Sequence, residues 1–205
     1  MSSITRLDIF SVIKLSGPDA HSFLQGQVTC DMNKLKEQAF LPGCHCNAKG
    51  KMWSTFIAFQ QDDALFLVMT KQSAEVSLSE LQKYGVFAKT DIVDDSANWH
   101  LYGANEAVAD TLSIRLAEQH YLLISRQPLN AQDDAPLWLK RDILSGRAHL
   151  FTNTVGEYVP QMLNLQALDY ISFNKGCYMG QETVARMRYL GKNKRALFLA
   201  HSPQP

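Results

Sequence analysis

Short segments with alternating apolar and polar side chains run through most of the chain, and this alternation predicts strands. The first is FSVIKLSG at 10–17. The segment CHCNAKGKMWSTFIAF at 44–59 reads as two strands joined by a tight turn at residues 47–50. Further strands are expected within the segments 63–70, 87–93, 98–104 and 112–125, the last as a hairpin.

Apolar residues at helical spacing predict helices between these strands. One helix is expected after Pro18–Asp19, and another covers 72–84 and ends at Gly85. Further helical segments are expected at 136–146, 164–171 and 180–190; in the first, the residues predicted to face inward are Leu137, Trp138, Ile143 and Leu144. Because strands and helices intersperse without a regular β-α-β alternation, we expect an α+β fold with antiparallel or mixed sheets.

Composition narrows the class of protein. The 205 residues are 46% hydrophobic and 20% charged, which is the balance of a globular protein with a buried core. Twenty basic and twenty acidic side chains cancel, which argues against direct binding to nucleic acid or to a membrane surface. The first residues do not resemble a secretory signal, so we expect a cytoplasmic protein. We also expect a monomer. Pro, Asn and Asp cluster in 126–136 and predict a domain boundary near residue 132.

The four cysteines lack the regular spacing of a secreted disulfide scaffold, so we expect reduced thiols. Cys44 and Cys46 flank His45, which invites a metal interpretation. Alternate residues of a strand face opposite sides, however, so one ion could not easily bind all three, and no metal site is expected. Cys30 is expected in the core.

Cys177 stands in a polar setting, within the motif KGCYMGQE at 175–182. Its neighbouring glycines allow a tight loop. The positive end of the helix predicted after the loop, together with Lys175, would favour a thiolate. The alternative is a small apolar residue that fills a turn. No histidine is close in sequence, so a protease-like dyad is not predicted.

This motif resembles the signature of the YgfZ-type folate-binding proteins, relatives of the glycine-cleavage T-protein that are linked to assembly or repair of iron–sulfur clusters. Segments similar to that family follow in the expected order at 15–31, 45–54, 164–173 and 184–197. The resemblance covers most of the chain, and 105–132 is its weakest part.

The resemblance implies a T-protein-like fold, in which three domains surround a central channel. Residues 1–46 and 133–195 would form a discontinuous folate-binding first domain. Residues 47–132 would form an inserted α+β second domain, and 196–205 would begin a C-terminal β-barrel that is missing or truncated here.

The resemblance also implies a cofactor, tetrahydrofolate or a one-carbon derivative, and residues that bind it. Phe10 and Trp138 correspond to aromatic positions that hold the folate ring, although Trp138 taken alone would be read as core. Lys49 is a candidate channel residue in what is chiefly a turn. Cys177, with Lys175 as its activator, is the expected chemical centre.

The helix after Cys177 carries the remaining candidates. Gln181 and Glu182 lie in its first turn, where they can bind a ligand or cap backbone amides. The helix ends in a basic tract, which is either a solvated helix end or, by the resemblance, the place that receives the anionic glutamate tail of a folate. The tract comprises Arg186, Arg188, Lys192, Lys194 and Arg195.

Two departures from the aminomethyltransferases bear on the reaction. Ser54 and Thr55 stand where those enzymes carry an acidic pair, and Leu144 stands where they carry a pterin-binding glutamate. Classical aminomethyl transfer is therefore not expected, and whether the protein is an enzyme stays open. We expect a folate-binding accessory protein that acts in assembly or repair of iron–sulfur proteins and, through them, in tRNA modification. Its transient partners would be iron–sulfur enzymes or assembly proteins. The alternatives are a folate-dependent one-carbon transferase and a thiol-ligated metal or cluster carrier.

Overall fold

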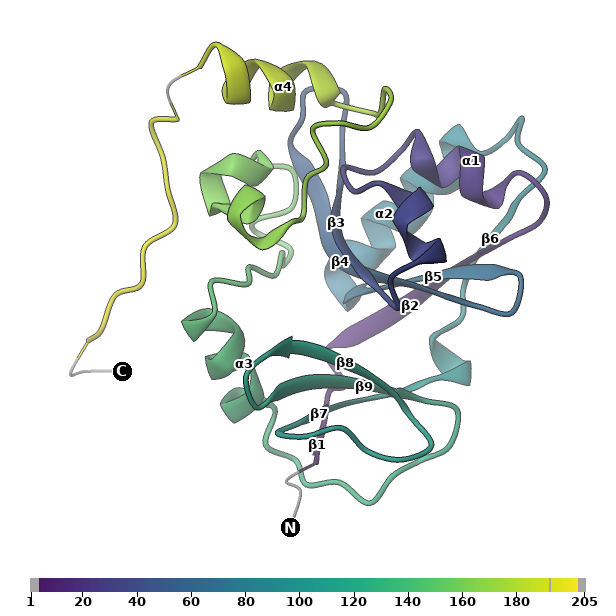
Figure 1. Cartoon of the computed structure of the whole chain (residues 1–205), viewed down its shortest axis with the longest axis vertical. Helices are drawn as coiled ribbons and strands as arrows, with labels where there is room; N and C mark the ends of the chain where they lie inside the picture. Colours follow the sequence, from purple (N-terminus) through teal and green to yellow (C-terminus); the bar gives the residue numbers. More distant parts are fainter. Residues whose placement is uncertain (1–3, 192, 203–205) are drawn as a thin grey trace.

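The computed structural model describes residues 4–191 and 193–202, and its centre is a five-stranded antiparallel sheet (Figure 1). The strand order is β3-β4-β5-β2-β6. The predicted tight turn at 47–50 joins β3 to β4. The strands are β2 (Phe10–Ser16), β3 (Leu41–Cys46), β4 (Met52–Gln61), β5 (Ala64–Thr70) and β6 (Asp91–Asp94).

A second, four-stranded antiparallel sheet lies below the first in Figure 1, in the order β1-β7-β9-β8. The β8–β9 hairpin at one edge of this sheet is the one that alternation predicted at 112–125. Gln132, at the predicted boundary, bridges to Thr5 of β1. The strands are β1 (Thr5–Arg6), β7 (His100–Ala104), β8 (Leu112–Ala117) and β9 (His120–Ser125).

Among the α-helices of the described residues, α2 alone has a side-chain hydrogen bond at its N-cap. The Thr70 side chain accepts a hydrogen bond from the amide of Ser73 and so caps α2, which ends before Gly85. The α-helices are α1 (Ala20–Gln25), α2 (Lys71–Tyr84), α3 (Ala135–Leu144) and α4 (Gln181–Tyr189). The part of the chain that the structure describes also has four short 3₁₀ helices, η1 (Met32–Lys36), η2 (Ser96–Asn98), η3 (Pro160–Leu163) and η4 (Leu165–Leu168).

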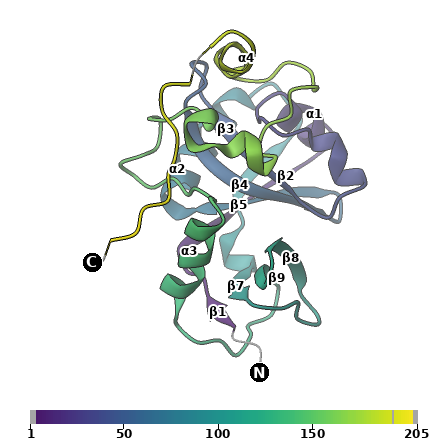
Figure 2. The same cartoon turned by 60° about the vertical axis from the view of Figure 1, so that its left-hand side comes forward.

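Both faces of the five-stranded sheet are buried, which explains why every residue of β5 is buried and all of them except Thr70 are apolar. Ile13 and Leu15 of β2 pack in a core with residues of α1 and α2, whereas Phe10 and Val12 pack in a core with residues of the four-stranded sheet and α3. A third core joins the β3–β4 hairpin to residues 150–184. Figure 2 shows α3 beside the four-stranded sheet and the C-terminal segment passing α3.

Three expectations about local structure were wrong. Residues 87–89 form turns instead of a strand, and Phe87 is 99% exposed. The segment 164–171 is one short 3₁₀ helix, because Asn164 and Asp169 at its two ends adopt left-handed backbone conformations that an α-helix cannot contain. In α3, Trp138 is buried as expected, but Leu137, Ile143 and Leu144 are exposed.

The sheets also correct one predicted domain boundary. A division between residues 46 and 47 would cut the β3–β4 hairpin, whose strands are paired from Leu41 to Cys46 in a single sheet. The two sheets separate instead between β6 and β7, around η2. Residues 196–202 form no strand, so the predicted start of a barrel is not seen within the described residues, and 203–205 lie outside them.

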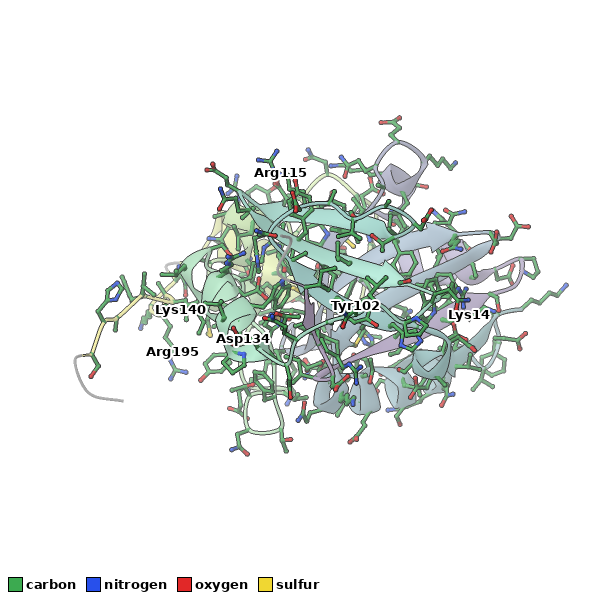
Figure 3. All side chains as sticks on the ribbon, turned by 90° about the horizontal axis from the view of Figure 1, so that it is seen from below. Lys14, Tyr102, Arg115, Asp134, Lys140 and Arg195 are labelled. Atoms are coloured by element: carbon green, nitrogen blue, oxygen red, sulfur yellow. The ribbon has the colours of Figure 1, made fainter. Side chains whose placement is uncertain are left out.

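Charged side chains lie on several sides of the molecule (Figure 3). Figure 3 shows Lys14, Arg115 and Lys140 on different sides of the molecule, whereas Tyr102 is only 1% exposed. No helix within the described residues is long and apolar enough to cross a membrane.

Gly103 of β7 leaves no room for a side chain, and a substitution can test this. A Cβ atom at this position would lie 1.9 Å from Cδ1 of Trp138, because the indole packs directly on the strand backbone. We expect Gly103→Ala to lower the free energy of unfolding by about 1–3 kcal/mol or more, the range for forced overpacking. Urea denaturation measures it, with Gly176→Ala as the control, since a Cβ atom there meets nothing within 4 Å. Equal stability of the two variants would contradict this packing.

Candidate functional site

None of the four cysteines forms a disulfide. Cys177 is exposed, whereas the other three cysteines are buried. Burial raises the pKa of the Cys30 thiol to about 12 and raises the pKa values of Cys44 and Cys46 as well. Cys30 lies in the core, as predicted. Cys177 is therefore the cysteine that a partner or reagent can reach.

The loop that carries Cys177 sits tightly on the β3–β4 turn. Gly180 has a φ of +79°, and a Cβ atom there would lie 2.4 Å from the carbonyl oxygen of Asn47. Across the same contact, a Cβ atom on Gly50 would lie 2.8 Å from Cβ of Thr183 in α4. The glycines of the turn and of the motif thus let α4 begin directly against the hairpin.

Lys175 anchors the other side of this loop. Its ammonium Nζ donates to the carbonyl oxygens of Gln25, Val28 and Cys30 at 2.6, 2.8 and 2.7 Å. Burial lowers the pKa of the Lys175 amine to about 8, while the nearby Cys30 and Asp31 oppose that shift, so the ammonium form still predominates at neutral pH. The structure thus gives Lys175 a positioning role, and its role as activator of Cys177 stays a prediction.

The structure brings Lys49, Gln181 and Glu182 into the region of Cys177. Lys49 is exposed in the turn that contacts α4. The backbone N–H of Gln181 donates to the carbonyl oxygen of Tyr178 at 3.1 Å. The exposed side chain of Glu182 has no hydrogen-bond partner among the described residues and so caps no backbone amide there. The basic tract, Arg186 included, is exposed as far as it is described, and Lys192 lies outside the described residues.

Phe10 and Trp138 occupy a different region, between the two sheets and α3. Their rings meet edge to face at 5.8 Å, and the Trp138 Nε1 donates to the carbonyl of Tyr121 at 3.0 Å. The indole lies between the backbone of Gly103 and the ring of His120. Trp138 is 4% exposed and therefore serves as core in this arrangement, while its stacking on a folate ring stays a prediction.

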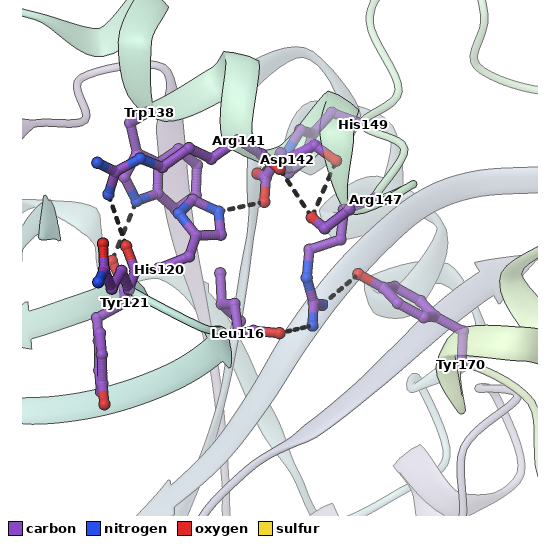
Figure 4. Close-up of polar contacts among 11 residues, drawn as sticks. Leu116, His120, Tyr121, Trp138, Arg141, Asp142, Arg147, His149 and Tyr170 are labelled. Atoms are coloured by element: carbon purple, nitrogen blue, oxygen red, sulfur yellow. Dashed lines mark hydrogen bonds and ion pairs between the residues drawn. The ribbon is translucent and has the colours of Figure 1, made fainter. Parts of the chain in front are cut away.

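A buried carboxylate network, which the sequence did not predict, lies next to Trp138 (Figure 4). Asp142 is 1% exposed and accepts hydrogen bonds from Nε2 of His120 at 2.7 Å and from Nε2 of His149 at 2.6 Å. Burial raises the pKa of Asp142, but these two hydrogen bonds outweigh burial and hold it below its usual value. The available sequence signal was that Asp142 follows Trp138 by four residues and so shares its buried helix face.

Arg147 extends this network toward β8. Its guanidinium donates to the carbonyl oxygen of Leu116 at 2.6 Å and to the hydroxyl of Tyr170 at 3.4 Å. Thr55, at one of the two positions where an acidic pair would stand, is buried nearby and donates to the carbonyl of Ala148 at 2.8 Å. The hydroxyl of Ser54 accepts a hydrogen bond from the hydroxyl of Ser77.

His149 and Arg147 also line a cavity of about 500 Å³, which we call the apolar cavity. It lies between α3, the loop 145–151, the 3₁₀ helices η3 and η4, and the C-terminal segment. This explains the exposed face of α3, since Ile143 and Leu144 form part of the wall. The other apolar wall residues are Leu139, Ala148, Phe151, Leu163, Ala167, Leu168, Leu197, Phe198 and Leu199.

The Cys44-His45-Cys46 segment points to two sides, as predicted. Both thiols lie in the third core, whereas the His45 ring contacts Ser77 of α2. Burial lowers the pKa of His45 to about 3. Within the described residues, no group of three or more histidine, cysteine or acidic side chains is arranged to hold a metal ion.

Replacing Asp142 by asparagine tests the carboxylate network through its pH dependence. The pKa of Asp142 is lower in the folded protein than in the unfolded chain. The ionised carboxylate therefore contributes fully to the free energy of unfolding above about pH 4, and this contribution is lost as pH falls through the pKa of the folded state. We expect Asp142→Asn to lower the free energy of unfolding by about 1–3 kcal/mol at pH 7, and the deficit to shrink below pH 4. Urea denaturation across this range measures it, with the exposed Asp133→Asn as control. A deficit independent of pH would exclude the ionised carboxylate as its source.

No protein-family model matches the chain, but individual proteins of known name do. The tRNA-modifying protein YgfZ of Colwellia psychrerythraea is 41% identical over 231 residues, covering 97% of this chain and 71% of that protein. The protein of the same name from Vibrio vulnificus is 38% identical, covering 96% and 69%.

Among solved structures, aminomethyltransferase T of the glycine cleavage system from Bartonella henselae matches with a TM-score of 0.51 and 15% identity, over 60% of this chain and 42% of that one. The likeness shows a shared fold, in agreement with the expected T-protein-like α+β architecture. The identity to the two bacterial relatives, over more than two thirds of their length, shows that the chain belongs to the YgfZ family of tRNA-modifying proteins.

Proposed function

We propose that this protein is a folate-binding factor that supports tRNA modification through iron–sulfur enzymes. The observation that carries the proposal is the apolar cavity, whose volume of about 500 Å³ lies within the range of about 300–1,000 Å³ typical of ligand sites. The name of the bacterial relatives supports the part that concerns tRNA modification. Iron–sulfur enzymes as partners follow from the family resemblance of the KGCYMGQE segment.

The residues around the apolar cavity fit a reduced folate. Leucine, isoleucine and phenylalanine side chains offer a wall for a flat ring, and His149, Arg147 and Asn164 add a few polar groups. Arg195 is exposed and lies two residues before Leu197, which lines the cavity, and in this proposal its cation receives the anionic glutamate tail. Phe10 and Trp138 would support the wall from behind, since Phe10 contacts the His149 ring at 5.1 Å.

Cys177 would serve a partner protein in this proposal. It is exposed and is not among the residues that line the apolar cavity. An exposed thiol in a loop fixed by Lys175 can be presented to an iron–sulfur enzyme or to its cluster during assembly or repair. The folate site and the thiol would thus be two separate functional regions of one chain.

Blocking the apolar cavity tests folate binding. Calorimetry under anaerobic conditions should detect tetrahydrofolate binding to the unchanged protein. Ala167 is an exposed wall residue, so Ala167→Trp should place an indole in the cavity and abolish binding while leaving the melting temperature unchanged. The matched control is Ala107→Trp, at an exposed position outside the wall. Equal affinity of the two variants would exclude the apolar cavity as the site.

Replacing Cys177 tests the thiol in cells. Cys177→Ser keeps the size but removes the ionisable thiol, so it should fold normally and lower the tRNA nucleosides made by iron–sulfur enzymes. Nucleosides made by enzymes without a cluster provide the control. Lys175→Met should also lower stability, by about 1–3 kcal/mol, because three carbonyl oxygens lose their donor. Unchanged nucleoside levels in the Cys177→Ser cells would remove the thiol from the function.

A further inference from the structure

The two imidazoles on Asp142 differ in what their second nitrogen can reach. His120 is 1% exposed, and its Nδ1 is buried with no hydrogen-bond partner in the described part of the chain. The side chain of His149 is 19% exposed and lines the apolar cavity. Its Nδ1 also has no partner among the described residues, yet it is not among the buried unpaired atoms, so it is accessible.

Asp142 determines which nitrogen of His149 carries the proton. An ionised carboxylate only accepts hydrogen bonds, so the Nε2 that lies 2.6 Å from Asp142 Oδ2 must donate. In the neutral imidazole the proton then sits on Nε2, and Nδ1 keeps a lone pair. His120 Nε2 donates to the other carboxylate oxygen at 2.7 Å, so Asp142 is held between the two rings.

The Nδ1 lone pair of His149 lies in mostly apolar surroundings. Phe10 covers one side of the His149 ring, and the nearby cation, Arg147, is turned to Leu116 and Tyr170. Most of the remaining wall consists of aliphatic and aromatic side chains. In such a cavity a small number of placed polar groups determines how a ligand is oriented.

We infer that His149 orients the ligand of the apolar cavity by accepting a hydrogen bond at Nδ1 from an N–H or O–H group of that ligand, with Asp142 as the positioning residue. The inference rests on the proposed function for the ligand's identity, since the pterin ring of a reduced folate carries several N–H donors. It assigns to His149 a role in recognition that the sequence did not suggest.

Two substitutions of His149 separate recognition from structure. His149→Gln places an amide near the position of Nε2, which retains a donor for Asp142 and removes the Nδ1 acceptor that the inference assigns to the ligand. His149→Asn places an amide near the position of Nδ1, which retains a polar group toward the cavity and leaves Asp142 with one partner fewer.

Calorimetry with tetrahydrofolate and thermal melting then give opposite patterns. We expect His149→Gln to bind roughly fivefold more weakly with an unchanged melting temperature, the effect of one lost neutral hydrogen bond. We expect His149→Asn to retain affinity within about twofold and to melt at a lower temperature. Equal losses of affinity in both variants, or none in His149→Gln, would overturn the inference.

Nitrogen NMR of histidine-labelled protein tests the same inference without a ligand. The spectrum should show His149 with a protonated Nε2 and an unprotonated Nδ1, and Asp142→Asn should disturb that assignment. If tetrahydrofolate failed to bind the unchanged protein, the proposed function would fall, whereas an unprotonated Nδ1 would still support an acceptor for another N–H or O–H ligand. A protonated Nδ1 in the neutral ring would overturn the inference in either case.

Discussion

The buried carboxylate of Asp142 is the constraint on which the region of the apolar cavity depends. It joins three parts of the chain, because α3 supplies the carboxylate, β9 supplies His120 and the loop after α3 supplies His149. A buried charge is tolerated only when its hydrogen-bonding capacity is met, so the three elements must hold their relative positions. One wall of the apolar cavity is therefore fixed by a polar interaction, while its lining remains apolar.

A second polar anchor fixes the cysteine region in a different way. The Lys175 ammonium meets three backbone carbonyls, so it constrains main-chain positions and not the identity of neighbouring side chains. The loop between Lys175 and α4 can therefore expose its thiol without becoming loose. Rigid backbone on both sides of an exposed reactive group is the usual arrangement when that group must meet a partner in one orientation.

The sequence predicted the parts of this molecule that local patterns encode. Alternation located β2, the β3–β4 hairpin and the β8–β9 hairpin, and the KGCYMGQE motif located the exposed cysteine and the helix after it. It misread the face of α3, because apolar periodicity cannot distinguish residues that pack in a core from those that line a cavity, as Ile143 does. It also misread 164–171, where backbone conformations at two residues override the helical spacing of side chains.

The carboxylate network could not be predicted, since it depends on partners from separate elements. His120 and Asp142 are 22 residues apart and belong to a strand and a helix. Neither residue stands in a recognisable motif, and a lone aspartate in a helix is ordinarily exposed. Only tertiary packing brings the second histidine to the same carboxylate.

The contact of Lys175 with Gln25 spans 150 residues of sequence, and this separation has a consequence for how the protein acquires its function. Closing so long a loop costs conformational entropy, which early local contacts cannot offset. During synthesis the N-terminal sheet can assemble while the segment around Cys177 is still being made. The anchored setting of Cys177 therefore requires that two segments far apart in the sequence have met, so a chain presents this thiol in a fixed loop only once Lys175 has reached the carbonyl oxygens of Gln25, Val28 and Cys30.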